Sequence, residues 1–170
     1  MKLNTVIKSS VLAILFSGAA MAAAGSNPTK TLAWSGFVPS GQPGTNLIIT
    51  GLAGQEVIPK GELNINTDGT FISSTVTVEA HDYTESSGAI GALADVKWTL
   101  ASADISMGDT DLSGAALVVK ANDAAWTVGE EFATAENTLR INVSQTAELN
   151  NVSGQRAQVA VTLMAAKDVG

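Results

Sequence analysis

Apolar side chains recur at every second position through most of this chain, and this alternation limits what it can fold into. In the run NTLRINVSQT, Leu139, Ile141 and Val143 are separated by the polar Arg140 and Asn142. Successive side chains of a β-strand point to opposite faces, so this spacing predicts a strand with one buried face. A helix would need apolar residues three and four positions apart, and no convincing amphipathic helix is present after the first segment.

Similar runs follow one another along the chain, and each is bounded by Gly, Asn, Asp or Ser. The other expected strands are NLIITGL, GELNIN, TFISSTVTVEA, ALADVKWTLAS, GAALVVKA, AAWTV and RAQVAVTLMAA. Asp68-Gly69 predicts a hairpin, because this pair accepts the positive φ of a tight turn. The run AHDYTESSGAIGAL is expected to hold a helical turn. Roughly eight to ten strands predict an all-β fold, an antiparallel β-sandwich of immunoglobulin-like size.

The first 22 residues have the features of a secretory signal peptide. Lys2 and Lys8 give a basic start, a short apolar run follows, and Ala20-Met21-Ala22 forms an A-x-A cleavage site. Cleavage at Ala23 or Ala24 is the alternative. No cysteine lies near this junction, which excludes a lipoprotein anchor. No later run reaches the ~18 apolar residues of a membrane span, so we expect a soluble, exported chain.

Composition excludes several classes of function. The chain has no cysteine, which rules out disulfides, zinc–thiolate sites and cysteine nucleophiles. Its formal net charge is −7, and loss of the two lysines of the leader makes the remainder more acidic. An acidic surface argues against binding to nucleic acid, so we expect no nucleic-acid partner.

Three short stretches resemble catalytic or metal-binding motifs. His81, the only histidine, precedes Asp82, but neighbours on a strand point to opposite faces, so we expect a loop or strand-end histidine. The run Asp109–Gly114 imitates half of a calcium loop, but Lys120 stands where a glutamate ligand belongs. The two carboxylates of Gly129–Phe132 are expected in a solvated turn. We predict no enzyme, cofactor or metal, and the alternative is a small secreted enzyme that uses His81.

The tryptophans offer a second alternative function. Trp34 and Trp98 lie in alternating runs and are expected in the core. Trp126 has a weaker context, and an exposed tryptophan there would suit stacking on a sugar ring. With Trp126 or Tyr83 as the platform, the chain would be a secreted monomeric β-sandwich carbohydrate-binding module.

The run TLAWSGFVPSG, close behind the leader, carries a resemblance to a known family. It places Leu32, Trp34, Gly36 and Val38 at alternate positions. This pattern resembles the first strand of chaperone–usher fimbrial pilins, and WSGFVPSG is similar to that of the cysteine-free colonisation-factor pilins. The resemblance implies an immunoglobulin-like sandwich that lacks its final strand. The vacant place is filled first by a periplasmic chaperone and then by the N-terminal extension of the next subunit.

On this resemblance the protein is a structural fimbrial subunit that polymerises by donor-strand exchange and supports adhesion. Its implied partners are identical subunits, a periplasmic chaperone, an outer-membrane usher and a host-surface receptor that the filament contacts. Residues 23–31 would be the donor-strand extension and residues 32–170 the pilin domain, on the cell surface after export through the periplasm. The donor residues in phase would be Ala24, Ser26, Pro28, Lys30 and Leu32. The rim of the acceptor groove would be Ala157, Val159, Val161 and Leu163.

Overall fold

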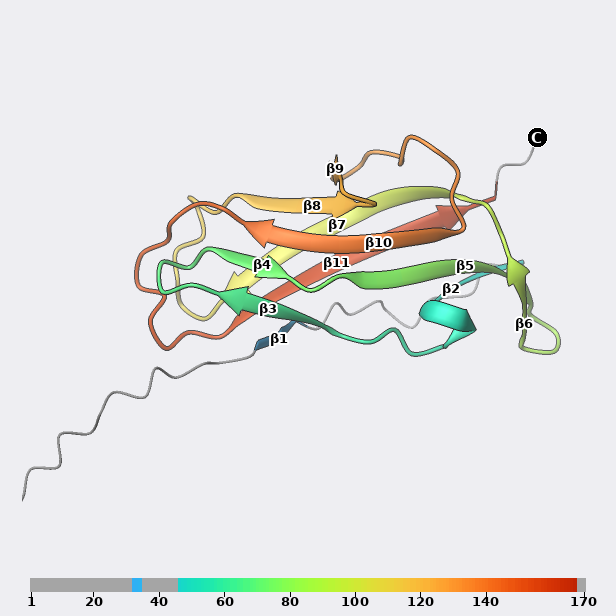
Figure 1. Ribbon diagram of the computed structural model, residues 1–170, viewed down its shortest axis with the longest axis horizontal. Helices are drawn as coiled ribbons and strands as arrows, with labels where there is room; N and C mark the ends of the chain where they lie inside the picture. The colour runs from blue at the N-terminus through green and yellow to red at the C-terminus, as the bar shows by residue number, and fades with distance from the viewer. Residues whose placement is uncertain (1–31, 35–45, 168–170) are drawn as a thin grey trace, which may run out of the picture.

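A computed structural model describes the backbone of residues 32–34 and all of residues 46–167, which form a β-sandwich (Figure 1). The expected all-β fold with antiparallel sheets is confirmed. The strands in these residues are β1 (Leu32–Trp34), β2 (Leu47–Thr50), β3 (Gly61–Ile65), β4 (Phe71–Ser73), β5 (Val76–Thr84), β6 (Ala89–Leu93), β7 (Lys97–Met107), β8 (Leu117–Ala121), β9 (Ala124–Trp126), β10 (Thr138–Gln145) and β11 (Ala157–Ala166). One turn of 3₁₀ helix, η1 (Leu52–Gly54), follows β2.

The larger sheet is built around β10. On one edge β10 pairs with β8, which carries β9, and on the other edge it pairs with β5 and β4. The strand β4 continues outward to β3 and β1, whereas β5 pairs with β2 and β6. The smaller sheet contains two strands, β7 and β11, which cross behind the larger sheet in Figure 1.

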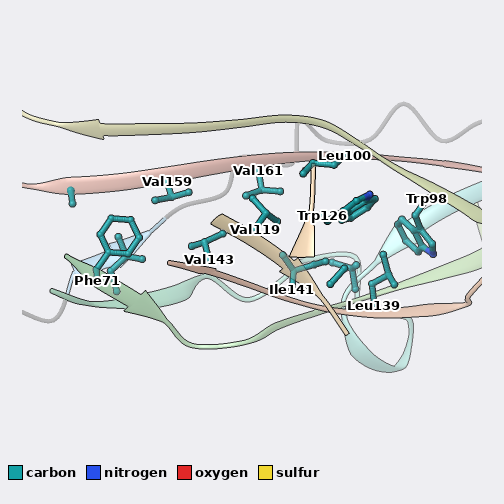
Figure 2. Close-up of a cluster of buried hydrophobic side chains, with 14 of the residues drawn as sticks. Phe71, Trp98, Leu100, Val119, Trp126, Leu139, Ile141, Val143, Val159 and Val161 are labelled. Carbon is teal, nitrogen blue, oxygen red and sulfur yellow. The ribbon is translucent and has the colours of Figure 1, made fainter. Parts of the chain in front are cut away.

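Side chains from both sheets meet in one apolar core. Figure 2 shows Trp98, Leu100, Val159 and Val161 of the smaller sheet facing residues of the larger one. Trp98 and Leu100 are fully buried, and the Trp98 indole N–H donates to the Glu136 carbonyl at 2.8 Å. The facing residues labelled in Figure 2 are Phe71, Val119, Leu139, Ile141 and Val143. The alternation predicted for β10 is therefore confirmed.

The hairpin predicted at Asp68-Gly69 joins β3 to β4. The Asn66 N–H donates to the Thr70 carbonyl at 2.9 Å, and Gly69 has a φ of 83°. The Asp68 carboxylate accepts hydrogen bonds from the Thr70 hydroxyl and N–H, which lower the Asp68 pKa below its ordinary value. Glycine tolerates this left-handed conformation because it has no Cβ.

Two expectations about the following region are wrong. The run expected to hold a helical turn instead forms the end of β5, a tight turn and β6, with Tyr83 opposite Ile90. Gly88, at a φ of 67°, lets the chain reverse within a few residues, so backbone pairing replaces a helix. The run TFISSTVTVEA is two strands rather than one, since β4 ends at Ser73 and β5 begins at Val76.

The longest strand, β7, contains a β-bulge. Its partners Thr162 and Leu163 on β11 lie opposite Ser102 and Leu100, which leaves Ala101 as the extra residue. The bulge shifts the phase of the alternation, so that even-numbered residues of β7 face the core before it and odd-numbered residues after it. Within residues 32–34 and 46–167, no helix is long and apolar enough to cross a membrane.

Candidate functional site: the unpaired edge of strand β11

Among the residues that the structure describes, strand β11 forms backbone pairs along only one of its edges. It runs antiparallel to β7 over its whole length, from Ala157 opposite Met107 to Ala166 opposite Lys97. In such a ladder about half of the N–H and C=O groups of a strand point toward its partner and the rest point away. No strand within residues 32–34 and 46–167 pairs with the groups that point away from β7.

The second edge of β7, in contrast, is partly occupied. The segment 129–136 runs along it, and the Phe132 and Glu136 N–H groups donate to the Trp98 and Val96 carbonyls at 2.7 and 3.0 Å. The small sheet is thus closed on the β7 side near Trp98 and is open along β11 in the part of the chain that the structure describes.

The sequence of β11 lacks the features that usually protect a free edge. Proteins block such edges with charged residues, proline or very short strands. The run AQVAVTLMAA is 10 residues long and contains no charged residue and no proline. Arg156 and Lys167 flank it, and neither lies within it. Its edge is therefore a long, uncharged template for an additional strand.

The inward side chains of β11 are largely buried. Ala157, Val159 and Val161 are 1%, 0% and 6% exposed, and Leu163 is half-buried against the core. On the opposite face Met164 is 55% exposed. Along this edge, an added strand would therefore gain most from backbone hydrogen bonds and less from filling an apolar groove.

The first strand, predicted from the run TLAWSGFVPSG, is confirmed at Leu32–Trp34. This strand, β1, pairs with Gly61–Leu63 of β3 and lies close to β11. Gly36 and Val38 of the predicted pattern lie outside the described residues. So do the expected donor residues Ala24, Ser26, Pro28 and Lys30.

The structure overturns the expectation for His81. The residue lies within β5 rather than in a loop or at a strand end, and it is 8% exposed. Its Nε2 lies 3.0 Å from the Glu79 carboxylate and its Nδ1 lies 3.0 Å from the Gly91 carbonyl. Sequence reasoning missed this pair, although its signal was present: an acid and a base two positions apart in a strand share one face.

Trp126 does not offer a platform for a sugar. It is 6% exposed, its ring meets that of Phe132 edge-on at 5.5 Å, and its indole N–H donates to the Glu130 carbonyl. Tyr83 is half-buried. An apolar groove of about 370 Å³ lies beside Trp126, and its lining residues are Ala103, Leu117, Val118, Val119, Ala125, Trp126, Thr127 and Val128.

The Asp109–Gly114 stretch forms turns, whereas Glu131 of the Gly129–Phe132 stretch forms a β-bridge with Thr99. The Asp111 carboxylate accepts a hydrogen bond from the Ser113 N–H at 2.9 Å, which lowers the Asp111 pKa below its ordinary value. Glu131 lies 3.6 Å from the Lys97 ammonium, and both side chains are exposed. In the described residues, no three His, Cys, Asp or Glu side chains are grouped as metal ligands would be.

Comparison of the chain with protein-family models, with curated proteins and with solved structures finds no match. The geometry of β11, whose second edge has no partner strand in the described part of the chain, is therefore the basis for a functional proposal.

Proposed function

We propose that this protein is a structural subunit of a bacterial surface fimbria, which polymerises by donor-strand exchange and supports adhesion through the filament. A neighbouring copy supplies residues 23–31 as a strand along the unpaired edge of β11. In this proposal the sandwich is immunoglobulin-like and incomplete, and no residue has a catalytic role.

One observation carries the proposal: β11 is long, uncharged and paired on one edge only within the described residues. An edge of this kind binds an extended segment through main-chain hydrogen bonds, while alternate side chains determine the register. It would also attract unwanted partners during export. A periplasmic chaperone that occupies the edge until assembly meets this need.

The composition of the expected donor segment suits such an edge. Ala24, Ser26, Pro28 and Lys30 are not large apolar residues, and the inward face of β11 is already largely buried. Backbone pairing then supplies most of the contact, although Pro28 lacks an N–H and interrupts it once. Because the donor segment and the acceptor edge are different parts of the chain, the contact is head-to-tail and repeats into an open filament.

Deletion of Ala23–Lys30 tests the proposal. We expect the truncated protein to remain a chaperone-bound monomer and to form no filaments, as seen by electron microscopy of cells that also express chaperone and usher. A shuffled segment of the same length and composition controls for the loss of chain. Filaments that assemble normally from the deleted protein would refute the proposal.

Two lysine substitutions, one on the acceptor strand β11 and one on β4, form a matched pair of variants. Met164 on β11 and Ile72 on β4 are both large, exposed apolar residues, at 55% and 64% exposure. We expect Met164→Lys to slow polymerisation, since charge on an edge opposes strand addition, and Ile72→Lys to leave it unchanged. Equal effects of the two substitutions would contradict the assignment of β11 as the acceptor.

The alternative, a secreted carbohydrate-binding module, predicts a stable monomer that needs no chaperone. The burial of Trp126 removes its main candidate for sugar stacking. If the intact protein purifies as a monomer that never forms filaments, the alternative replaces the proposal.

A further inference from the structure

A buried acid–base pair lies on β5, on the face opposite the main core. Val78 and Ala80 point into the sandwich, while Glu79 and His81 share the other face. Although that is the outer face of the sheet, Glu79 and His81 are only 6% and 8% exposed. Other segments of the chain therefore cover these two side chains, and the hydrogen bonds show which segments they are.

Two segments contact this pair. The Glu79 carboxylate accepts the Gly54 N–H of η1 at 3.2 Å, and the same oxygen lies 3.0 Å from His81 Nε2. The other ring nitrogen of His81 lies 3.0 Å from the Gly91 carbonyl of β6. The two side chains therefore join β5, β6 and η1 at one corner of the sandwich.

The conformation of η1 is adapted to this contact. Ala53 and Gly54 have φ values of 59° and 72°, in the left-handed region. For Ala53 this conformation is unfavourable, and surrounding contacts must maintain it. A Cβ added at Gly54 would lie 3.7 Å from His81 Cε1, so the turn is closely packed on the imidazole ring.

The surroundings of the ring select its charged form. Both ring nitrogens face oxygen atoms that accept hydrogen bonds, a carboxylate oxygen and a carbonyl oxygen. A neutral imidazole has one N–H, so one of these contacts would bring two acceptors together. Only the imidazolium donates to both.

We propose that Glu79 and His81 form a pH-sensitive latch: while His81 is protonated the pair holds η1 and β6 on β5, and deprotonation of His81 releases them. The latch needs no ligand and does not depend on the proposed fimbrial function.

The direction of the pH dependence follows from both groups. Burial alone would lower the His81 pKa, but hydrogen bonds to Glu79 and Gly91 and the nearby carboxylates together raise it above 6.5. The hydrogen bond from His81 outweighs burial and lowers the Glu79 pKa below 4.5. Because the His81 pKa is raised in the closed state, protonated His81 stabilises that state at acidic pH. This contribution is lost as the pH rises through the pKa of the closed state. The Glu79 contribution is lost as pH falls through its lowered pKa.

Few other titratable groups are available to produce the same effect. Those in the described elements around His81 are Glu79, Asp82 and Tyr83 on β5, Glu85 in the turn to β6, Glu56 after η1, Arg140 on β10 and Lys167 after β11. Lys167 is paired with the exposed Asp82 carboxylate, which lies on the opposite face of β5 from His81. The strands β2 and β6 themselves carry no titratable side chain. Asp82 is exposed, makes no hydrogen bond to His81 and is the smallest contributor to its raised pKa, so it serves as the comparison for Glu79.

The test uses the fact that His81 is the only histidine, so its ring resonances can be followed by NMR without assignment. We expect a His81 pKa above 6.5 in the wild-type protein, a lower pKa in Glu79→Gln, and a smaller decrease in Asp82→Asn, because Asp82 contributes only its charge and no hydrogen bond to the ring. Hydrogen exchange, corrected for intrinsic rates, is measured at about pH 5.5 and 8.5, on either side of the ordinary histidine range.

Protection of residues 51–58 and 89–93 should fall at the higher pH, tenfold for each pH unit that separates the closed and open His81 pKa values. The β8–β9 hairpin should show no such fall. In Glu79→Gln the difference should shrink, and in Asp82→Asn it should persist. If Glu79→Gln does not fold, the titration of His81 and the hydrogen exchange of the wild-type protein still test the latch. A His81 pKa at or below 6.5, or equal pH dependence in the latch segments and β8–β9, overturns the proposal.

Discussion

Gln145 at the end of β10 offers a test of how the larger sheet is held at its edge. The side chain is 1% exposed and bonds only to backbone groups. Its Oε1 accepts the N–H groups of Ala116 and Ala147 at 3.0 and 2.8 Å, and its Nε2 donates to the Ala147 carbonyl at 2.5 Å. One amide thus ties the loop before β8 and the loop after β10 to the sheet.

We expect Gln145→Met to lower the free energy of unfolding by about 2 kcal/mol. Methionine keeps the length of the side chain but loses all three hydrogen bonds, and a backbone group left without its partner costs about 1–3 kcal/mol when buried. Ala116 is exposed and Ala147 half-exposed, so water can replace part of the lost bonding, which brings the net cost below the sum over the three backbone groups. For a chain of this length the melting temperature should fall by roughly 4–8 °C.

The assay is equilibrium denaturation in urea, with the slope checked for two-state behaviour. Gln158→Met on β11 is the matched control, because Gln158 is exposed and should change stability by less than about 0.5 kcal/mol. If Gln145→Met is as stable as the control, the amide does not hold these loops, and the reasoning fails.

Two further changes test turn geometry and core packing. Gly69→Ala should cost about 2–4 kcal/mol, since φ is 83° and the new Cβ would lie 2.9 Å from Val152 Cγ1. Gly88→Ala, at a φ of 67° with open space around it, should cost only about 1 kcal/mol; thermal denaturation that ranks the two in reverse would contradict this geometry. Trp98→Phe should cost about 2 kcal/mol in urea, because a fully buried indole loses packing and its bond to Glu136, and a cost near zero would place this ring outside the core.

Much of the fold could be predicted from the spacing of apolar residues. Leu139, Ile141 and Val143 are buried as their alternation required, and Asp68-Gly69 forms the expected turn. The bulge at Ala101 could not be predicted. It moves the buried positions of β7 from even to odd residues, so no single alternating pattern fits the whole strand.

The candidate site was only partly visible in the sequence. The apolar alternation of β11 predicted a strand. That one of its edges has no partner strand within residues 32–34 and 46–167 depends on which strands become neighbours, and this is a property of the tertiary fold. The burial of His81 likewise depends on η1 folding over β5 from more than twenty residues away in the sequence. The sequence left open whether Trp126 is exposed. Its contact with Phe132 could not be predicted, because the spacing of residues around Trp126 does not show how the following loop folds back onto the ring.

The central claim is that the free edge of β11 receives a strand from another molecule, and engineered disulfides test it most directly. The chain has no cysteine, so each introduced pair reports one contact. Asn27→Cys in the donor segment is combined in turn with a cysteine at the outward positions 158, 160, 162 and 164 of β11. Lys120→Cys, exposed on β8, is the control partner.

We expect at least one β11 position to give a ladder of disulfide-linked oligomers in assembled material, while the Lys120 pair gives monomers. Linked filaments from the Lys120 pair, or intact filaments in which none of the four β11 positions forms an intermolecular disulfide, would contradict the account.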